Sequence, residues 1–238
     1  MKSSEIISIK HLSLQYRPRS WPFAVERRAE IDAHFERVRE DRPKIWNGQV
    51  LMMHHHRLDR DTLEGAFLQT DFASFIAWRD WGFPQAGLIN CFSMGALRTS
   101  DGAWLMGEMG AHTSAAGKIY FPAGTPDPDD IVNGVVDLAG NMIREVAEET
   151  GLGPGDFTEA AAWHCVADDV RMALIKVLQA RERADVLRRR ILEHLESEAT
   201  PELADIHIVR SRRDYDSMMP GFVTTFLDHA AFSAHTRS

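Results

Sequence analysis

Residues 144–152 read REVAEETGL, and this stretch decides how the sequence is interpreted. In a helix, Glu149 lies about 40° to one side of Glu145 and Glu148 about 60° to the other, because each residue turns the chain by roughly 100°. Three carboxylates therefore share one helix face. Their mutual repulsion costs free energy in water, whereas a hard divalent cation with oxygen ligands would turn the same cluster into a binding site.

The residues before this stretch predict a helix that ends with it. Between residues 135 and 150, apolar side chains recur every four positions, at Leu138, Met142 and Val146. Gly151 then supplies a helix stop. Taken alone, neighbouring glutamates on a helix are more often a solvated face than a site, so the functional interpretation depends on the whole nine-residue string and the loop before it.

That string resembles the second half of the Nudix hydrolase signature, G-x5-E-x7-R-E-U-x-E-E-x-G-U, in which U is aliphatic. Every specified position of this half is matched, by Arg144, Glu145, Val146, Glu148, Glu149, Gly151 and Leu152. The resemblance implies an α/β protein with the Nudix fold, in which a mixed β-sheet is sandwiched between helices. We expect an N-terminal extension over residues 1–47 and the Nudix hydrolase domain over residues 48–238.

The first half of the signature departs from the family pattern. The position of its early glutamate is occupied by Val136, with Asp137 one residue later as the nearest replacement, and the position of its opening glycine by Asp130. The equivalent glycine is expected at Gly124, which lies 20 residues before Arg144 instead of 14. This spacing implies a six-residue insertion in the Gly/Pro/Asp-rich loop that residues 123–133 are expected to form.

The resemblance also implies roles for individual residues. Glu145 and Glu149 are expected to bind Mg²⁺ directly, with Mn²⁺ as an alternative, and Glu148 either binds the ion or supports its ligands. The carbonyl of Ala123 or Gly124 is expected to complete the set. Arg144 is expected to orient the carboxylates through a salt bridge, and Glu145 or Glu148 to act as the general base.

The family often draws one more acidic residue from a later loop. Glu202, just before a predicted strand, is preferred here over Glu198. His112 and Lys118 flank a glycine-bounded loop at 110–117 and could contact a substrate phosphate, although a plain surface loop is the alternative.

The reaction that the resemblance implies is hydrolysis of a diphosphate linkage in a nucleoside diphosphate joined to another moiety. A weaker likeness to UDP-sugar-cleaving members lies upstream, in Trp46-Asn47-Gly48 and Thr70-Asp71-Phe72, and points to a nucleotide sugar. The rival hypothesis is a Nudix-like domain that binds a nucleotide as a sensor or regulator without cleaving it. The irregular first half of the signature favours this rival, and the intact glutamates oppose it.

Periodicity and turn residues predict the other elements. Strands are expected at 49–58, 63–70, 88–97, 103–109, 119–121, 157–166, 170–178 and 206–209, and helices at 22–42, 72–80, 181–196 and 222–232. Residues 1–20 could form an edge strand or an arm. The turn Ser100-Asp101-Gly102 predicts a hairpin. The N-terminal extension could cover the site or mediate a homodimer.

Composition narrows the class of protein. The 238 residues carry a formal net charge of −8, which argues against binding to nucleic acid because phosphate neutralisation needs a basic surface. Two cysteines are too few for a disulfide framework. No apolar run reaches the roughly 18 residues of a membrane span, and the first residues lack the layout of a signal peptide. A cytoplasmic protein that acts on a small nucleotide, away from membranes, is expected.

Overall fold

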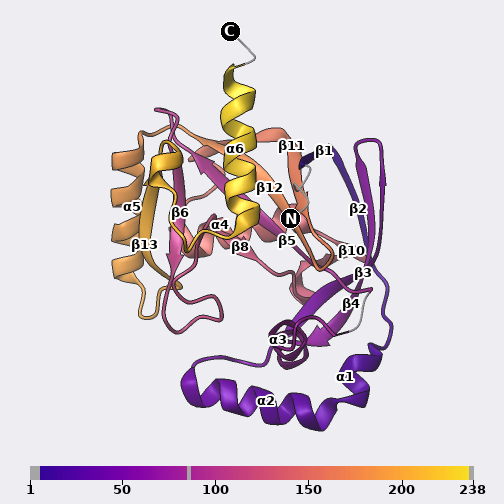
Figure 1. Ribbon diagram of the computed structural model, residues 1–238. Coiled ribbons are helices and arrows are strands. Elements are labelled where there is room, and N and C mark those ends of the chain that lie inside the picture. Colours follow the sequence, from indigo (N-terminus) through magenta and orange to yellow (C-terminus); the bar gives the residue numbers. More distant parts are fainter. Residues whose placement is uncertain (1–5, 85–86, 236–238) are drawn as a thin grey trace.

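The computed structural model describes residues 6–84 and 87–235, whose strands form two sheets (Figure 1). The larger sheet has the strand order β1 (Ile6–Ile9), β11 (Phe157–Ala167), β12 (Arg171–Ala180), β5 (Asn90–Arg98), β6 (Trp104–Met109), β13 (Leu203–Val209), and two short strands, β7 (Ile119–Tyr120) and β8 (Ala123–Gly124), pair with β6 and β5. The smaller sheet has the order β3 (Gln49–Asp59), β4 (Thr62–Asp71), β2 (His11–Tyr16), β10 (Val135–Val136), β9 (Ile131–Val132). Each sheet is mixed, since β12 runs parallel to β5 and β2 runs parallel to β4.

Helices cover both faces of the larger sheet. Alternate residues of β5 point to opposite faces: Cys91 and Leu97 join the core that holds α4 (Leu138–Thr150) and α5 (Ala184–Ser197), and Phe92 and Met94 join the core under α6 (Gly221–His235). The predicted fold class, a mixed sheet between helices, is confirmed. The sequence predicted a single mixed sheet. The smaller, second sheet was not predicted.

The smaller sheet is also covered on both faces. Leu51 and Phe67 of β3 and β4 pack into the core with α4, while Met52 and Leu68 pack against three helices. These helices are α1 (Pro22–Glu26), α2 (Arg28–Asp41) and α3 (Phe72–Asp80), which lie together at the lower edge of Figure 1. The predicted helix at 22–42 is therefore two helices with a break at Arg27, whose backbone lies outside the helical region.

The N-terminal segment contributes to both sheets. β1 pairs with β11 at the edge of the larger sheet, and β2 lies inside the smaller sheet between β4 and β10. The alternative of a free arm for residues 1–20 is therefore wrong over the part of this segment that the structure describes. The domain boundary at residue 47 stays a prediction, and the extension packs into the rest of the chain.

Most other elements occur where periodicity placed them. The hairpin of β5 and β6 around Ser100–Gly102 is present, with Leu97 paired to Leu105. The expected loop at 123–133 is only partly irregular, because it contains β8, β9 and the 3₁₀ helix η1 (Pro128–Asp130). A second 3₁₀ helix, η2 (Arg212–Asp214), precedes α6. Among the described residues, no helix has the length and apolar character needed to cross a membrane.

Candidate active site

The helix α4 holds the acidic stretch against the larger sheet. Met142 and Val146 face Gly95 of β5 so closely that a Cβ on this glycine would overlap the Val146 side chain. Asp137 caps the helix by accepting a hydrogen bond from the Gly140 backbone at 2.9 Å. The helix starts at Leu138 and not at residue 135 as predicted, because Val135 and Val136 pair with β9.

Glu149 is the most buried carboxylate of the stretch, with 4 % of its surface exposed. Its Oε1 accepts a hydrogen bond from the Ala123 backbone N at 3.3 Å, and its Oε2 is buried with no hydrogen-bond partner. Burial raises the pKa of Glu149 well above its ordinary value, and the charges of Glu202 and Glu145 raise it further. A buried acceptor without a donor is costly, so this oxygen is placed to bind something that the chain itself does not supply.

Glu145 lies beside Glu149 and directly over Gly124. A Cβ built on Gly124 would overlap the carboxylate of Glu145. Gly124 is held there by β8, where it pairs with Ser93 of β5. Burial raises the pKa of Glu145 to about 7, although the charge of Arg144 acts in the opposite direction. The structure thus brings the predicted residues Glu145, Glu149 and Gly124 together.

Glu202 joins this group from the segment before β13. Its backbone carbonyl accepts a hydrogen bond from Gly110 N at 2.7 Å. Burial raises its pKa, and the nearby His112 lowers it. Burial raises the pKa of the Tyr120 hydroxyl, and the negative charges of Glu149, Glu202 and Glu145 raise it further. Glu198, the alternative to Glu202, lies 3.5 Å from His194 on α5.

Arg144 and Glu148 lie at the outer side of the cluster. The Glu148 side chain is 61 % exposed, and it lies 3.4 Å from Nη1 of Arg144. The same Arg144 nitrogen is 3.0 Å from Oε1 of Glu145. The guanidinium therefore bridges the exposed and the buried carboxylates, and the orienting role expected for it stays a prediction.

Asp130 is a further carboxylate at this site, and no role was expected for it from the sequence. Its buried carboxylate accepts hydrogen bonds from Arg144 Nη2 at 3.2 and 3.3 Å and from Asn141 Nδ2 at 2.9 Å. Asn141 is fixed in turn by Ser93, whose hydroxyl donates to Asn141 Oδ1 at 2.6 Å. Asp137, expected to replace the early glutamate, caps α4 instead. The signal for Asp130 was its position at the unmatched first glycine of the signature.

The oxygen atoms at this site are of the kind that binds a divalent cation. The unpartnered Oε2 of Glu149 and the absence of a side chain at Gly124 leave carboxylate oxygens available beside a backbone carbonyl. Hard cations prefer such oxygen ligands. Among the side chains that the structure describes, however, no three His, Cys, Asp or Glu side chains are grouped closely enough to hold a metal ion as they stand. Two of the predicted ligands, Glu145 and Glu148, contact Arg144. These side chains would have to move before they could bind an ion.

A cleft of about 560 Å³ opens beside Ala123 and Gly124. Five of its lining side chains are aromatic, namely Phe72, Phe75, Phe92, Tyr120 and Phe222, and three are cationic, namely Arg79, Lys118 and Arg171. Lys118, expected to contact substrate, therefore faces this cleft. His112 is not among the lining residues and lies near Glu202. Aromatic faces and cations at an acidic site suit a ligand with a planar base and phosphates.

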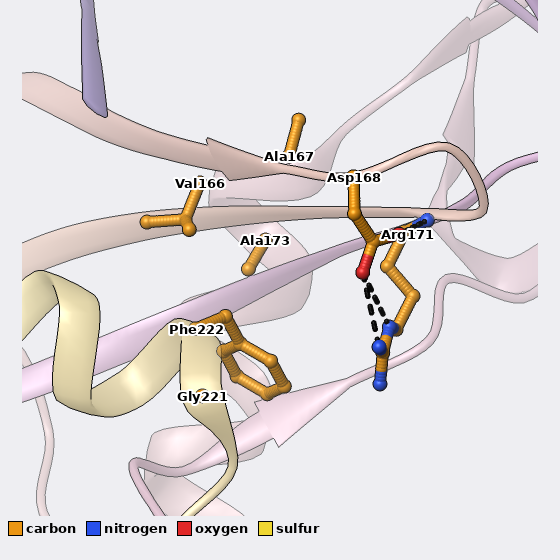
Figure 2. Close-up of a pocket in the computed structure, with 7 residues that line it drawn as sticks. All are labelled: Val166, Ala167, Asp168, Arg171, Ala173, Gly221 and Phe222. Atoms are coloured by element: carbon orange, nitrogen blue, oxygen red, sulfur yellow. Dashed lines mark hydrogen bonds and ion pairs between the residues drawn. The ribbon is translucent and has the colours of Figure 1, made fainter. Parts of the chain in front are cut away.

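A smaller pocket of about 140 Å³ adjoins this cleft through Arg171, Gly221 and Phe222 (Figure 2). Arg171 donates from Nε and Nη2 to Asp168 Oδ2 at 3.1 and 3.0 Å. Figure 2 shows this pair beside the Phe222 ring at the start of α6. The guanidinium is therefore held in place, with its charge partly neutralised, where the two hollows meet.

Comparisons with known proteins identify similar solved structures only at low similarity. No protein-family model matches the chain. No curated protein sequence matches it either. A Nudix hydrolase from M. smegmatis, RenU, is 13 % identical, with 62 % of this chain and 86 % of that chain covered and a TM-score of 0.41. The MutT protein from Methanosarcina mazei Go1 is 17 % identical, with coverages of 63 % and 96 % and a TM-score of 0.41.

An Ap4A hydrolase from C. elegans is 13 % identical, with 60 % of this chain and 98 % of that chain covered and a TM-score of 0.39. At these values the similar structures carry no conclusion about the function of this chain.

Proposed function

We propose that this protein hydrolyses a diphosphate linkage in a nucleoside diphosphate joined to another moiety, using Mg²⁺ or Mn²⁺. The observation that supports this most directly is the buried Glu149 carboxylate. The Oε2 atom of Glu149 has no hydrogen-bond partner. Burial raises the pKa of Glu149, and the charges of Glu202 and Glu145 raise it further. A fold gains nothing in stability from such a cluster, so a ligand that neutralises it is the simplest reason for its presence.

Each residue has a role in this proposal. Glu145, Glu149 and Glu202, with the backbone carbonyl of Ala123 or Gly124, would hold the cation, and Glu148 would bind or support it from the rim. A bound divalent cation supplies positive charge against the diphosphate oxygens. Arg144 positions Glu145 and Glu148, and one of these two glutamates accepts the proton of the attacking water.

The cleft beside Gly124 would hold the substrate. Lys118 lines it, as do Arg79 and Arg171. These cations are suited to the phosphates, and the aromatic residues are suited to a base. A nucleotide sugar is the narrower proposal. It is supported by the likeness of Trp46–Gly48 and Thr70–Phe72 to UDP-sugar-cleaving proteins, since Phe72 begins α3 and lines the cleft. The proposed partner is a small nucleotide, and we propose no binding to nucleic acid or to a membrane. The proposed location is the cytoplasm. A homodimer is one option for the oligomeric state.

A second candidate function is nucleotide binding without cleavage. It is favoured by the ion pair between Arg144 and Glu145, because this pair engages a carboxylate that the hydrolase would use to bind the cation. Under this alternative, the cleft binds a nucleotide as part of a sensor or regulator, and no bond of the nucleotide is cleaved. Turnover distinguishes the two candidates.

The test is product release from a panel of nucleotide sugars, ADP-ribose, dinucleoside polyphosphates, coenzyme A and nucleoside triphosphates. Each is assayed with Mg²⁺, with Mn²⁺ and with chelator. We expect metal-dependent cleavage of one class of compound. Nucleotide binding without any cleavage in the panel would favour the second candidate.

A further inference from the structure

Asn90, the first residue of β5, has a buried side-chain oxygen with no hydrogen-bond partner. The backbone of Asn90 is satisfied, since its N donates to the Val170 carbonyl at 2.9 Å. The side chain lines the 560 Å³ cleft. Buried polar atoms of folded proteins are almost always hydrogen-bonded. An unpartnered amide at a cleft is therefore placed to bind a group that enters the cleft.

Aromatic side chains from two different parts of the fold line the same cleft. Phe72 and Phe75 of α3 form a pair with ring centroids 5.8 Å apart, and Phe92 of β5 lies 5.6 Å from Phe222 of α6. Asn90 and Phe92 are two residues apart on one strand and so project from the same face. The cleft that the amide lines thus has surfaces suited to a flat ring.

The strand β5 fixes the backbone spacing between Asn90 and the residue that pairs with Gly124. Gly124 pairs with Ser93, which is three residues after Asn90 on β5. Three residues of a strand span about 10 Å. This is comparable with the distance from the edge of a nucleobase to its 5′-phosphate. Arg171, which pairs with Asn90 in the parallel register of β12 and β5, also lines the cleft.

We propose that Asn90 is a specificity-determining residue that hydrogen-bonds the edge of a nucleobase. Its Oδ1 accepts from an N–H of the base and its Nδ2 donates to the neighbouring acceptor, while the base lies against the aromatic side chains. This inference rests on the proposed function only in that the base belongs to the nucleotide part of that substrate. Because Phe72 and Phe75 line the same cleft, the segment upstream of β5 helps to select the base.

The experiment measures binding of nucleoside monophosphates by calorimetry, in chelator, so that no cleavage is needed. AMP, GMP, CMP and UMP are each compared with an analogue whose base has lost an N–H donor. These analogues are purine riboside monophosphate, N1-methyl-GMP, the 4-deamino analogue of CMP and N3-methyl-UMP. Wild type is expected to bind one natural nucleotide about 10-fold more tightly than its analogue, because the analogue leaves the amide oxygen unpaired.

In Asn90→Leu, which keeps the size of the side chain, this discrimination is expected to fall below about twofold. Asn90→Asp keeps the acceptor oxygen and loses the donor, so it is expected to bind the same nucleotide more weakly. Gln49→Ala is the matched control, because it removes an exposed amide on β3, outside this cleft. It is expected to leave the discrimination unchanged.

Two results would overturn the inference. One is full discrimination by Asn90→Leu, or binding of the natural nucleotide by Asn90→Asp as tight as that of wild type, in whichever of the two variants melts as cooperatively as wild type. The other is failure of wild type to bind any of the four monophosphates. Failure of the proposed function is recognised separately, as base-selective binding through Asn90 with no cleavage of any diphosphate. Cleavage with no effect of Asn90 would leave the proposed function standing and overturn this inference.

Discussion

Nη2 of Arg144 donates to both carboxylate oxygens of Asp130, at 3.2 and 3.3 Å. This contact joins η1 to the acidic face of α4. Asn141 donates to the same carboxylate and also lies 3.5 Å from Glu145. The position of Glu145 therefore depends on a residue in the loop that departs from the family pattern.

Replacing Asp130 by Asn should lower activity. The substitution keeps the shape of the side chain but removes the charge that holds Arg144, and hydrogen bonds to charged groups contribute about 1.5–3 kcal/mol. We expect kcat/KM to fall about 10- to 100-fold, since 1.4 kcal/mol corresponds to a factor of ten. Steady-state kinetics on the substrate from the panel measure this.

Asp137→Ala is the matched control for Asp130. It removes the cap of α4, which should cost about 1 kcal/mol of stability and lower the Tm by roughly 2–4 °C. Its kcat/KM should stay at the wild-type value. The reverse pattern, with activity lost in Asp137→Ala and kept in Asp130→Asn, would show that Asp137 has the role expected from the sequence.

Gly124→Ala should impair the site without unfolding the protein. The new Cβ would overlap the Glu145 carboxylate and push it away from Glu149. We expect at least a 10-fold loss of kcat/KM, by the same conversion of about 1.4 kcal/mol. Gly153→Ala is the control, because a Cβ there meets no atom within 4 Å. Equal activity in the two variants would contradict a role for Gly124.

Periodicity predicted the elements that the acidic stretch needs. Leu138, Met142 and Val146 are all buried, as their four-residue spacing requires, and Gly151 ends α4 with a φ of 70°. These features depend on near neighbours in the sequence, so a single chain reveals them. The grouping of Glu202 with the cluster was inferred from the family resemblance and not from spacing.

The remaining parts of the site depend on contacts between distant segments. Asp130 reaches Arg144 because β9 and β10 fold the insertion back against β2, and no local pattern encodes this pairing. Asn90 and Phe72 line one cleft although Asn90 lies on β5 of the larger sheet and Phe72 lies on the helix α3. Two short strands of two residues each are also too small to leave a period in the sequence.

Glu145→Gln should stabilise the protein at alkaline pH in the presence of chelator. Burial raises the pKa of Glu145 from 4.5 to about 7 in the folded state. The folded state then binds more protons than the unfolded state, so wild-type stability falls as pH rises from about 4.5 through 7. A neutral amide avoids this loss. We expect a Tm about 2–4 °C above wild type at pH 8, and a difference near zero at pH 5.

A second pH dependence comes from the turn between β5 and β6. Asp101 accepts hydrogen bonds from Thr99 Oγ1 at 2.7 Å, from Ala184 N at 3.0 Å and from Arg210 at 3.0 Å. The Thr99 hydrogen bond, with those from Ala184 and Arg210, lowers the pKa of Asp101 far below its ordinary value of 3.8. The folded-state pKa is depressed, so this stabilisation is present above the unfolded-state pKa and is lost as pH falls through the folded-state pKa.

The Asp101→Asn variant should therefore have a lower Tm than wild type at pH 7. The difference in Tm should narrow once the pH falls below about 4. This difference in Tm is measured by thermal melts of the variant and wild type at about six pH values between about 2.5 and 7. A difference that stays constant over this range would show that the charge of Asp101 contributes nothing.

The most direct test of the account is turnover by wild type and Glu149→Gln on the diphosphate panel, with Mg²⁺ and with chelator. Glutamine fills the same buried position but cannot supply the charged Oε2 atom. We predict cleavage of one class of compound by wild type with Mg²⁺. In chelator and in Glu149→Gln, the rate should fall by at least about 100-fold, while the variant melts at or above the wild-type Tm. Equal turnover by the folded variant, or no turnover of any compound by wild type, would contradict the account.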